Sequence, residues 1–172
     1  MNSKTMYILV AALVIVIVVA GIGIYLYMGT GGGGGGGGGG ENTYTVSNAT
    51  SVQYSVNFTD PDGVTGIYKF SGKDITGNLT LRVDIEGGGT TYSYIMNSTA
   101  EMSWANLDGT WAESDFATDW ASWGTQWTTY LDKLKNNWSG TGDYSYTDAD
   151  GNAILIYNIS TSSLPDSLFQ HS

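Results

Sequence analysis

Ten consecutive glycines, at residues 31–40, divide this chain into two parts that cannot fold together as one compact unit. A glycine run of this length has no side chains to bury and is expected to behave as a flexible coil. The segment before it contains an apolar stretch, residues 6–28, without a charge or a proline. The sequence therefore predicts an N-terminal segment at residues 1–28, a glycine-rich linker at residues 29–41 and one folded domain at residues 42–172.

The apolar stretch at residues 6–28 is long enough to cross a membrane as a helix. At about 1.5 Å of rise per residue it spans about 34 Å, more than the roughly 30 Å hydrocarbon core of a bilayer. A cleaved secretory signal is the competing interpretation, but the apolar run continues through residues 25–28, which favours an uncleaved anchor. Lys4 and the terminal amine precede it, so we expect a cytoplasmic N-terminus and an extracellular domain on a single-pass cell-membrane protein.

The composition of the folded part excludes several classes of function. Residues 41–172 carry sixteen acidic residues against five basic ones, a formal charge of −11, which argues against nucleic acid as a partner and also suits solubility in salty surroundings. The chain has no cysteine, and its one histidine, His171, stands next to last. A thiol nucleophile, a Ser-His-Asp triad and a histidine metal site therefore lack their residues. We expect no cofactor, no metal and no enzymatic activity.

Alternating apolar and polar residues predict an antiparallel sheet with one buried face. SVQYSVNFT, residues 51–59, places its valines and aromatics on one parity, and NLTLRVDIE, residues 78–86, does the same with leucine, valine and isoleucine. TTYSYIMN, residues 90–97, continues the pattern after a glycine turn. Further segments at residues 66–72, 100–107, 144–148 and 152–160 bring the expected number to about seven strands.

The apolar period changes from two to three or four between Ser114 and Trp138, which predicts one long helix. Ser114 is a plausible N-cap, and Gly124 in the middle could permit a bend or a close approach. The expected architecture is α+β: a transmembrane helix, then a curved antiparallel sheet with the aromatic-faced helix on its concave side. The helix stripe consists of Phe116, Trp120, Trp123, Trp127, Tyr130, Leu131, Leu134 and Trp138.

Three pieces of sequence resemble the LolA/LolB family of lipoprotein-sorting carriers. LPDSLFQ, residues 164–170, is similar to the closing segment of that family, and LRV at residues 81–83 and WANLDGTW at residues 104–111 are weaker matches. The resemblance implies an incomplete β-barrel closed by helices, with an apolar cavity suited to acyl chains. It also implies a lid-anchoring arginine, and Arg82 is the only arginine in this chain. On the strand pattern alone, Arg82 instead pairs with Asp84, with Glu86 or with an acidic residue of a neighbouring strand on the solvated face.

Two functions stay open at this stage. The first is a tethered, non-catalytic domain that binds a lipid or another apolar ligand between sheet and helix. The second is a structural surface glycoprotein, part of an envelope or adhesion assembly, with a filled core. A pilin-like subunit and an enzyme are weaker alternatives. The residues expected to line a ligand cavity are Tyr92, Tyr94, Trp104, Phe116, Trp120, Trp123, Trp127 and Leu131.

Six of the eleven asparagines begin N-x-S/T sequons, more than about two expected by chance. Such density is typical of extracellular glycoproteins, including archaeal surface proteins. Asn57, Asn78 and Asn97 fall on the polar parity of their strands, whereas Asn158 is ambiguous because it shares parity with Ile154 and Ile156. The expected glycosylation sites are Asn48, Asn57, Asn78, Asn97, Asn137 and Asn158.

Overall fold

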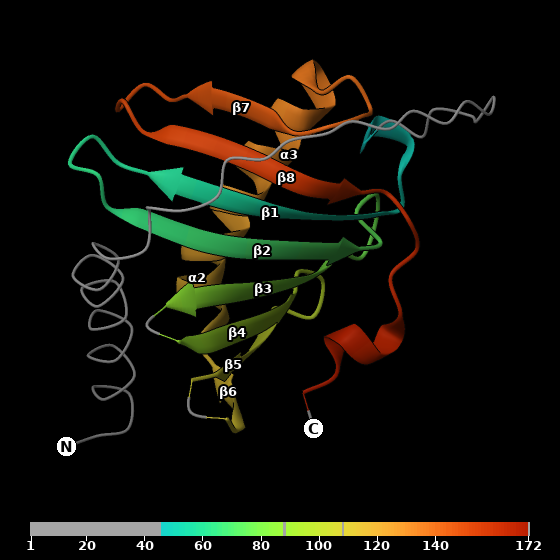
Figure 1. The fold of residues 1–172 in the computed structure, drawn as a ribbon. Helices are drawn as coiled ribbons and strands as arrows, with labels where there is room; N and C mark the ends of the chain where they lie inside the picture. Colours follow the sequence, from blue (N-terminus) through green and yellow to red (C-terminus); the bar gives the residue numbers. More distant parts are fainter. Residues whose placement is uncertain (1–45, 88, 108, 172) are drawn as a thin grey trace.

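The computed structural model describes residues 46–171, apart from Gly88 and Asp108. After a short 3-10 helix, η1 (Val46–Asn48), the described chain forms one eight-stranded antiparallel sheet that is open at both edges, with one helical stretch across a single face (Figure 1). The α+β expectation is confirmed in this form. The strands run in the order β6-β5-β4-β3-β2-β1-β8-β7. Their bounds are β1 Ser51–Thr59, β2 Thr65–Lys73, β3 Thr80–Gly87, β4 Thr90–Asn97, β5 Met102–Asn106, β6 Trp111–Ser114, β7 Tyr144–Thr147 and β8 Ala153–Ser160.

The sheet has one strand more than the sequence predicted. The additional strand is β6, a four-residue edge strand that pairs antiparallel with β5. Only Trp111 of its four residues is bulky and apolar, so it lacks a recognisable alternation. Pairing with β5 supplies the backbone hydrogen bonds that hold so short a segment extended.

The buried face of the sheet follows the predicted parity. Across the central strands, Tyr54 lies opposite Phe70, Phe70 opposite Val83, and Val83 opposite Tyr94. All four side chains are at most 6% exposed. We call the face that carries them, and that the helix covers, the inner face, and the opposite one the outer face. The register fixes every other strand residue to one of the two.

The helical stretch covers residues 116–137 and is interrupted by a wider turn. It consists of α2 (Phe116–Asp119), a π-helical turn η2 (Trp120–Gly124) and α3 (Thr125–Asn137). The N-cap is Asp115, whose carboxylate accepts a hydrogen bond of 2.9 Å from the backbone N–H of Thr118. The expected N-cap, Ser114, is wrong by one residue because Ser114 is the last residue of β6.

Gly124 is required by the packing of its own helix. A Cβ on Gly124 would lie 2.4 Å from the nearest ring atom of Trp120, four residues earlier, which real Cβ atoms do not tolerate. The π-helical turn and the missing side chain together let the Trp120 indole lie against the helix backbone. Of the two interpretations offered by the sequence, close approach is the one observed.

Residues 1–45 lie outside the described part of the chain, so the anchor at residues 6–28 and the glycine linker remain predictions. Among the described residues, no helix combines the length and the apolar character that crossing a membrane requires. At the other end of the domain, the chain leaves β8 and crosses to the outer face, where it forms a short 3-10 helix, η3 (Asp166–Phe169) (Figure 1).

Candidate functional site

The interior between sheet and α3 is filled by aromatic rings. Trp127 is 1% exposed, and its indole stacks on Tyr54 of β1 with ring centroids 5.3 Å apart and planes 7° apart. The ring of Phe70 in β2 packs beside this pair, with its centroid 6.3 Å from that of Trp127. A Cβ on Gly72 would lie 2.5 Å from the Trp127 ring, so the indole sits directly on the backbone of β2. The space between the sheet and α3, where an acyl chain would have to bind, is therefore occupied by side chains.

A buried tyrosine hydroxyl forms a hydrogen bond between the sheet and α3. The hydroxyl of Tyr54 donates a hydrogen bond of 3.1 Å to the backbone carbonyl of Trp127. Burial raises the pKa of the Tyr54 hydroxyl well above its usual value, with nearby Tyr130 contributing, so the hydroxyl stays protonated as a donor. Burial likewise raises the pKa of Tyr130. Tyr54 is therefore a fixed donor inside the core, and neither hydroxyl acts as an acid near neutral pH.

The N-terminal half of the helical stretch covers its part of the sheet less completely. Phe116, Trp120 and Trp123 are all half-buried, and α2 has no fully buried residue. Trp123 lies between Tyr68 and Tyr94, with both ring centroids 5.7 Å away. This aromatic end of the inner face therefore retains exposed apolar surface.

The register separates one predicted cavity residue from the rest. Trp104 of β5 lies opposite Ile95 of β4, which places both on the outer face. Its indole stacks on His171 at 3.9 Å with planes 10° apart, and it does not line the interior. This placement corrects the expectation for Trp104. The other predicted residues lie on the inner face or on the helix that covers it: Tyr92, Tyr94, Phe116, Trp120, Trp123, Trp127 and Leu131.

A buried carboxylate joins the helix to the β5–β6 hairpin. One Asp119 oxygen accepts hydrogen bonds of 2.5 Å from the hydroxyls of Ser103 and Ser114. The Ser114 hydroxyl also lies 3.0 Å from that of Ser103. Burial raises the pKa of Asp119, while the two serine hydrogen bonds act against that rise. The three side chains hydrogen-bond to one another and so join the helical stretch to β5 and β6.

Arg82 contacts the C-terminal segment on the outer face. Its Nε donates to Asp84 at 2.9 Å, and its Nη1 donates to the backbone carbonyl of Leu168 at 2.9 Å. Its guanidinium also lies 5.9 Å from the centre of the Trp111 ring. The predicted pairing with Asp84 is observed. An anchor toward the helix is not, because Arg82 and the helix lie on opposite faces of the sheet.

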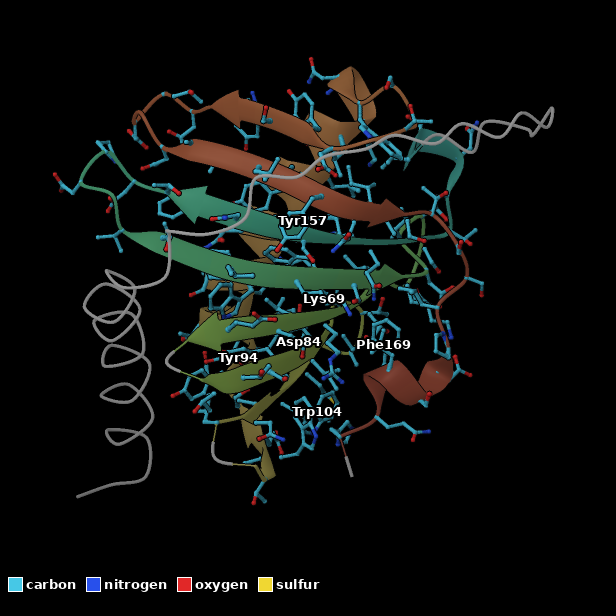
Figure 2. All side chains as sticks on the ribbon, in the orientation of Figure 1. Lys69, Asp84, Tyr94, Trp104, Tyr157 and Phe169 are labelled. Carbon is cyan, nitrogen blue, oxygen red and sulfur yellow. The ribbon has the colours of Figure 1, made fainter. Side chains whose placement is uncertain are left out.

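The sequence did not predict that the C-terminal segment, residues 164–171, docks on the outer face of the sheet. Figure 2 places Asp84, Trp104 and Phe169 on the viewer's side of the sheet, with α3 behind it. Lys73 forms an ion pair with Asp166 of η3, which raises the pKa of the Lys73 amine. The one indication in the sequence that this face binds the segment was the strand alternation, which placed Arg82 on the polar face.

Two hollows lie at the β7 edge, away from the aromatic core. The first, on the outer face, has a volume of about 320 Å³ and is lined by Asn57, Thr59, Leu155 and other residues of β7 and β8. The second, about 380 Å³, lies between α3 and β7 beside Lys133 and Tyr146. In the first hollow, Asn57 Oδ1 is buried without a hydrogen-bond partner. Both are open surface depressions rather than enclosed apolar sites.

The sequon asparagines differ in exposure. Asn57 and Asn97 are half-buried, and Asn97 Oδ1 accepts hydrogen bonds from the backbone N–H groups of Thr99 and Ala100. Asn158 is exposed, has φ of +52° and lies where the β1–β8 register shifts, so its ambiguous parity comes from an irregularity in β8. The fully exposed sequon asparagines are Asn48, Asn78, Asn137 and Asn158.

Neither metal chemistry nor similarity to other proteins adds a further site. Within the described ranges, no group of three or more histidine, aspartate or glutamate side chains could hold a metal ion. Comparisons with protein families, with curated protein sequences and with solved structures find no match to this chain.

Proposed function

We propose that this chain is a membrane-anchored, non-catalytic surface glycoprotein whose extracellular domain is a structural component of an envelope or adhesion assembly. The observation that carries the proposal is the packing of the Trp127 indole, which stacks on the Tyr54 ring and lies against the backbone of Gly72. A carrier of acyl chains needs an apolar cavity of several hundred Å³. Here the corresponding space holds core side chains, which supports a domain that presents its surfaces instead of enclosing a ligand.

The chemistry of the described residues supports a non-catalytic role. The half-buried carboxylate of Asp119 is held by two serine hydroxyls that also contact each other. The buried tyrosines Tyr54 and Tyr130 have raised pKa values and remain protonated. Acid–base catalysis needs a group whose pKa is near the working pH and that reaches a substrate. These three groups point into packing contacts.

The proposal is tested by titrating the full chain, in detergent, with a dansyl-labelled fatty acid and with benzene. We expect neither to bind with a defined stoichiometry. Leu134→Ala is the positive control, because Leu134 is 1% exposed and its truncation leaves an apolar cavity in the core cluster that contains Trp127. Benzene binding by Leu134→Ala but not by the native chain supports the proposal. Saturable fatty-acid binding by the native chain would overturn it.

A second candidate, binding of an apolar ligand, is favoured by the half-covered aromatic end of the inner face. Phe116, Trp120 and Trp123 retain exposed surface there, beside the π-helical turn that ends at Gly124. The resemblance to lipoprotein carriers points to the same class of ligand. If this candidate is correct, Trp123→Ala weakens fatty-acid binding at least tenfold. The surface variant Thr129→Ala on the exposed side of α3 leaves it unchanged.

A further inference from the structure

The C-terminal segment, residues 164–171, is held on the outer face by side chains of the sheet and not by a strand ladder. Lys73 pairs with Asp166, Arg82 donates to the Leu168 carbonyl at 2.9 Å, and Trp104 stacks on His171 at 3.9 Å. Figure 1 shows η3 beside the lower strands, after a connection that runs down from the end of β8. No residue of this segment is fully buried. It therefore docks as a ligand would, through a few discrete contacts.

The surface that receives the segment is chemically distinct from the rest of this acidic domain. All three basic side chains of the sheet, Lys69, Lys73 and Arg82, lie on the outer face of β2 and β3. Ile95 lies in register between Arg82 and Trp104, both of which contact the segment, and it is 1% exposed. The surface thus combines three basic side chains, of which Arg82 is also paired with Asp84, with an apolar centre and an aromatic ring. It matches a peptide with an acidic residue followed by apolar and aromatic ones.

The connection to the segment permits docking on another molecule. Residues 161–164 join β8 to Pro165, and both serines among them are exposed. The backbone hydrogen bond from Leu168 to Pro165 lies within the segment itself, so it is kept wherever the segment docks. Exchange of an identical element between copies keeps every contact and is a low-cost route to association. Tethering on one membrane raises the effective concentration of the partner's segment.

We propose that the outer face is an interaction surface for the C-terminal segment of a second copy of this chain. Asp166, Leu168 and His171 of one molecule then contact Lys73, Arg82 and Trp104 of its neighbour. The exchange links tethered domains on a membrane without adding a new interface. It rests on the proposed function for the tether and the assembly role, but it does not depend on whether the interior is filled.

The Lys73–Asp166 ion pair offers a direct test in the unmodified protein. Full chains labelled with ¹⁴N and with ¹⁵N are mixed in equal amounts, placed together in phosphatidylcholine vesicles and treated with a water-soluble carbodiimide. The reagent joins a lysine amine and a carboxylate in contact by an amide bond. Mass spectrometry then shows whether the two joined peptides carry the same isotope or different ones. The Lys135–Asp132 pair, three residues apart in α3, is the matched control because it forms within one chain.

Docking between copies predicts mixed-isotope 73–166 products that approach about half of the total when exchange is complete, and that fall when the vesicles are diluted with lipid. The 132–135 product stays unmixed. Asp166→Asn removes the 73–166 product and leaves the control product. The inference is overturned if, at the highest protein density, the mixed-isotope fraction of the 73–166 product is no larger than that of the 132–135 product. That result leaves the proposed function standing, since ligand binding is measured separately.

Discussion

The indole of Trp127 in α3 rests on the backbone of Gly72 in β2, so closely that a Cβ at residue 72 would lie 2.5 Å from two of its ring atoms. The contact joins the most buried part of the helix to the centre of the sheet. It sets the distance between the two layers, because a bulkier residue at either position forces them apart. The filled interior depends on this pair.

Gly72→Ala should therefore destabilise the domain, by about 1–3 kcal/mol, the usual cost of overpacking a core. Gly66→Ala is the matched control on the same face of β2. There the new Cβ meets the hydroxyl end of Tyr68 at 2.6 Å, and this half-exposed side chain can move aside. Urea unfolding followed by tryptophan fluorescence measures both. Equal free energies of unfolding for the two variants would contradict the close packing of Trp127 on Gly72.

The buried carboxylate of Asp119 predicts a specific pH dependence. Its pKa in the folded state lies above the ordinary value of 3.8, mainly because of burial. The stabilising effect of protonation is then complete below pH 3.8 and is lost as the pH rises through the folded-state pKa. Asp119→Asn cannot titrate. Its free energy of unfolding, relative to that of the native chain, should rise with pH from about pH 4 and then level off.

Asp119→Ala separates the charge from the hydrogen bonds. It removes the acceptor of Ser103 and Ser114, and we expect it to be less stable than Asp119→Asn by about 1–3 kcal/mol. Urea unfolding at a series of pH values gives all the comparisons. A difference between Asp119→Asn and the native chain that does not change with pH would rule out the raised pKa.

Asn57 carries a polar atom that the fold leaves unpaired. Its Oδ1 is buried without a partner, between Leu155 and Ile67 in register on the outer face. Asn57→Val should stabilise the unglycosylated domain by about 1 kcal/mol, since it removes an unsatisfied group and suits a strand. Gln53→Val is the control on the same strand and face. It loses the hydrogen bond of 2.8 Å to the fully buried Ser71 and should destabilise.

The exposure of the sequons predicts an order of glycan occupancy. Asn48, Asn78, Asn137 and Asn158 are exposed, whereas Asn57 is half-buried with its Oδ1 enclosed. In a host that glycosylates extracellular sequons, we expect the four exposed sites to be modified ahead of Asn57. Enzymatic deamidation in ¹⁸O-labelled water, followed by peptide mass spectrometry, marks each occupied site. Full occupancy at Asn57 with bare Asn158 would contradict this order.

The sheet and the helix were predictable because their apolar periods are regular. In β1 and β3 every second side chain is buried or nearly so, and the helix stripe through Trp127 and Leu134 faces the core as expected. Local sequence carries this information, since one face of each element must be covered. The number of strands and the N-cap were missed by one each, because β6 is held by its pairing with β5 rather than by its own pattern.

The faces of isolated residues depend on pairing over long distances. In β5 the large residue Trp104 lies outside, while Ser103 and Ala105 lie inside. The small side chains are inward because Asp119 of the helical stretch approaches there. A pattern that assigns bulky residues to the core therefore misplaces Trp104. The docking of the C-terminal segment was equally hidden, because it depends on Lys73 and Arg82, which are adjacent only in the folded sheet.

Native mass spectrometry of the full chain, extracted from its own membrane, tests the central claim most directly. If Trp127, Tyr54 and Phe70 fill the interior as described, the chain carries its own mass plus any covalent glycans, and mild activation releases no lipid. A stoichiometric lipid that survives detergent exchange, and that Trp123→Ala removes, would contradict a filled structural domain and establish an apolar ligand instead.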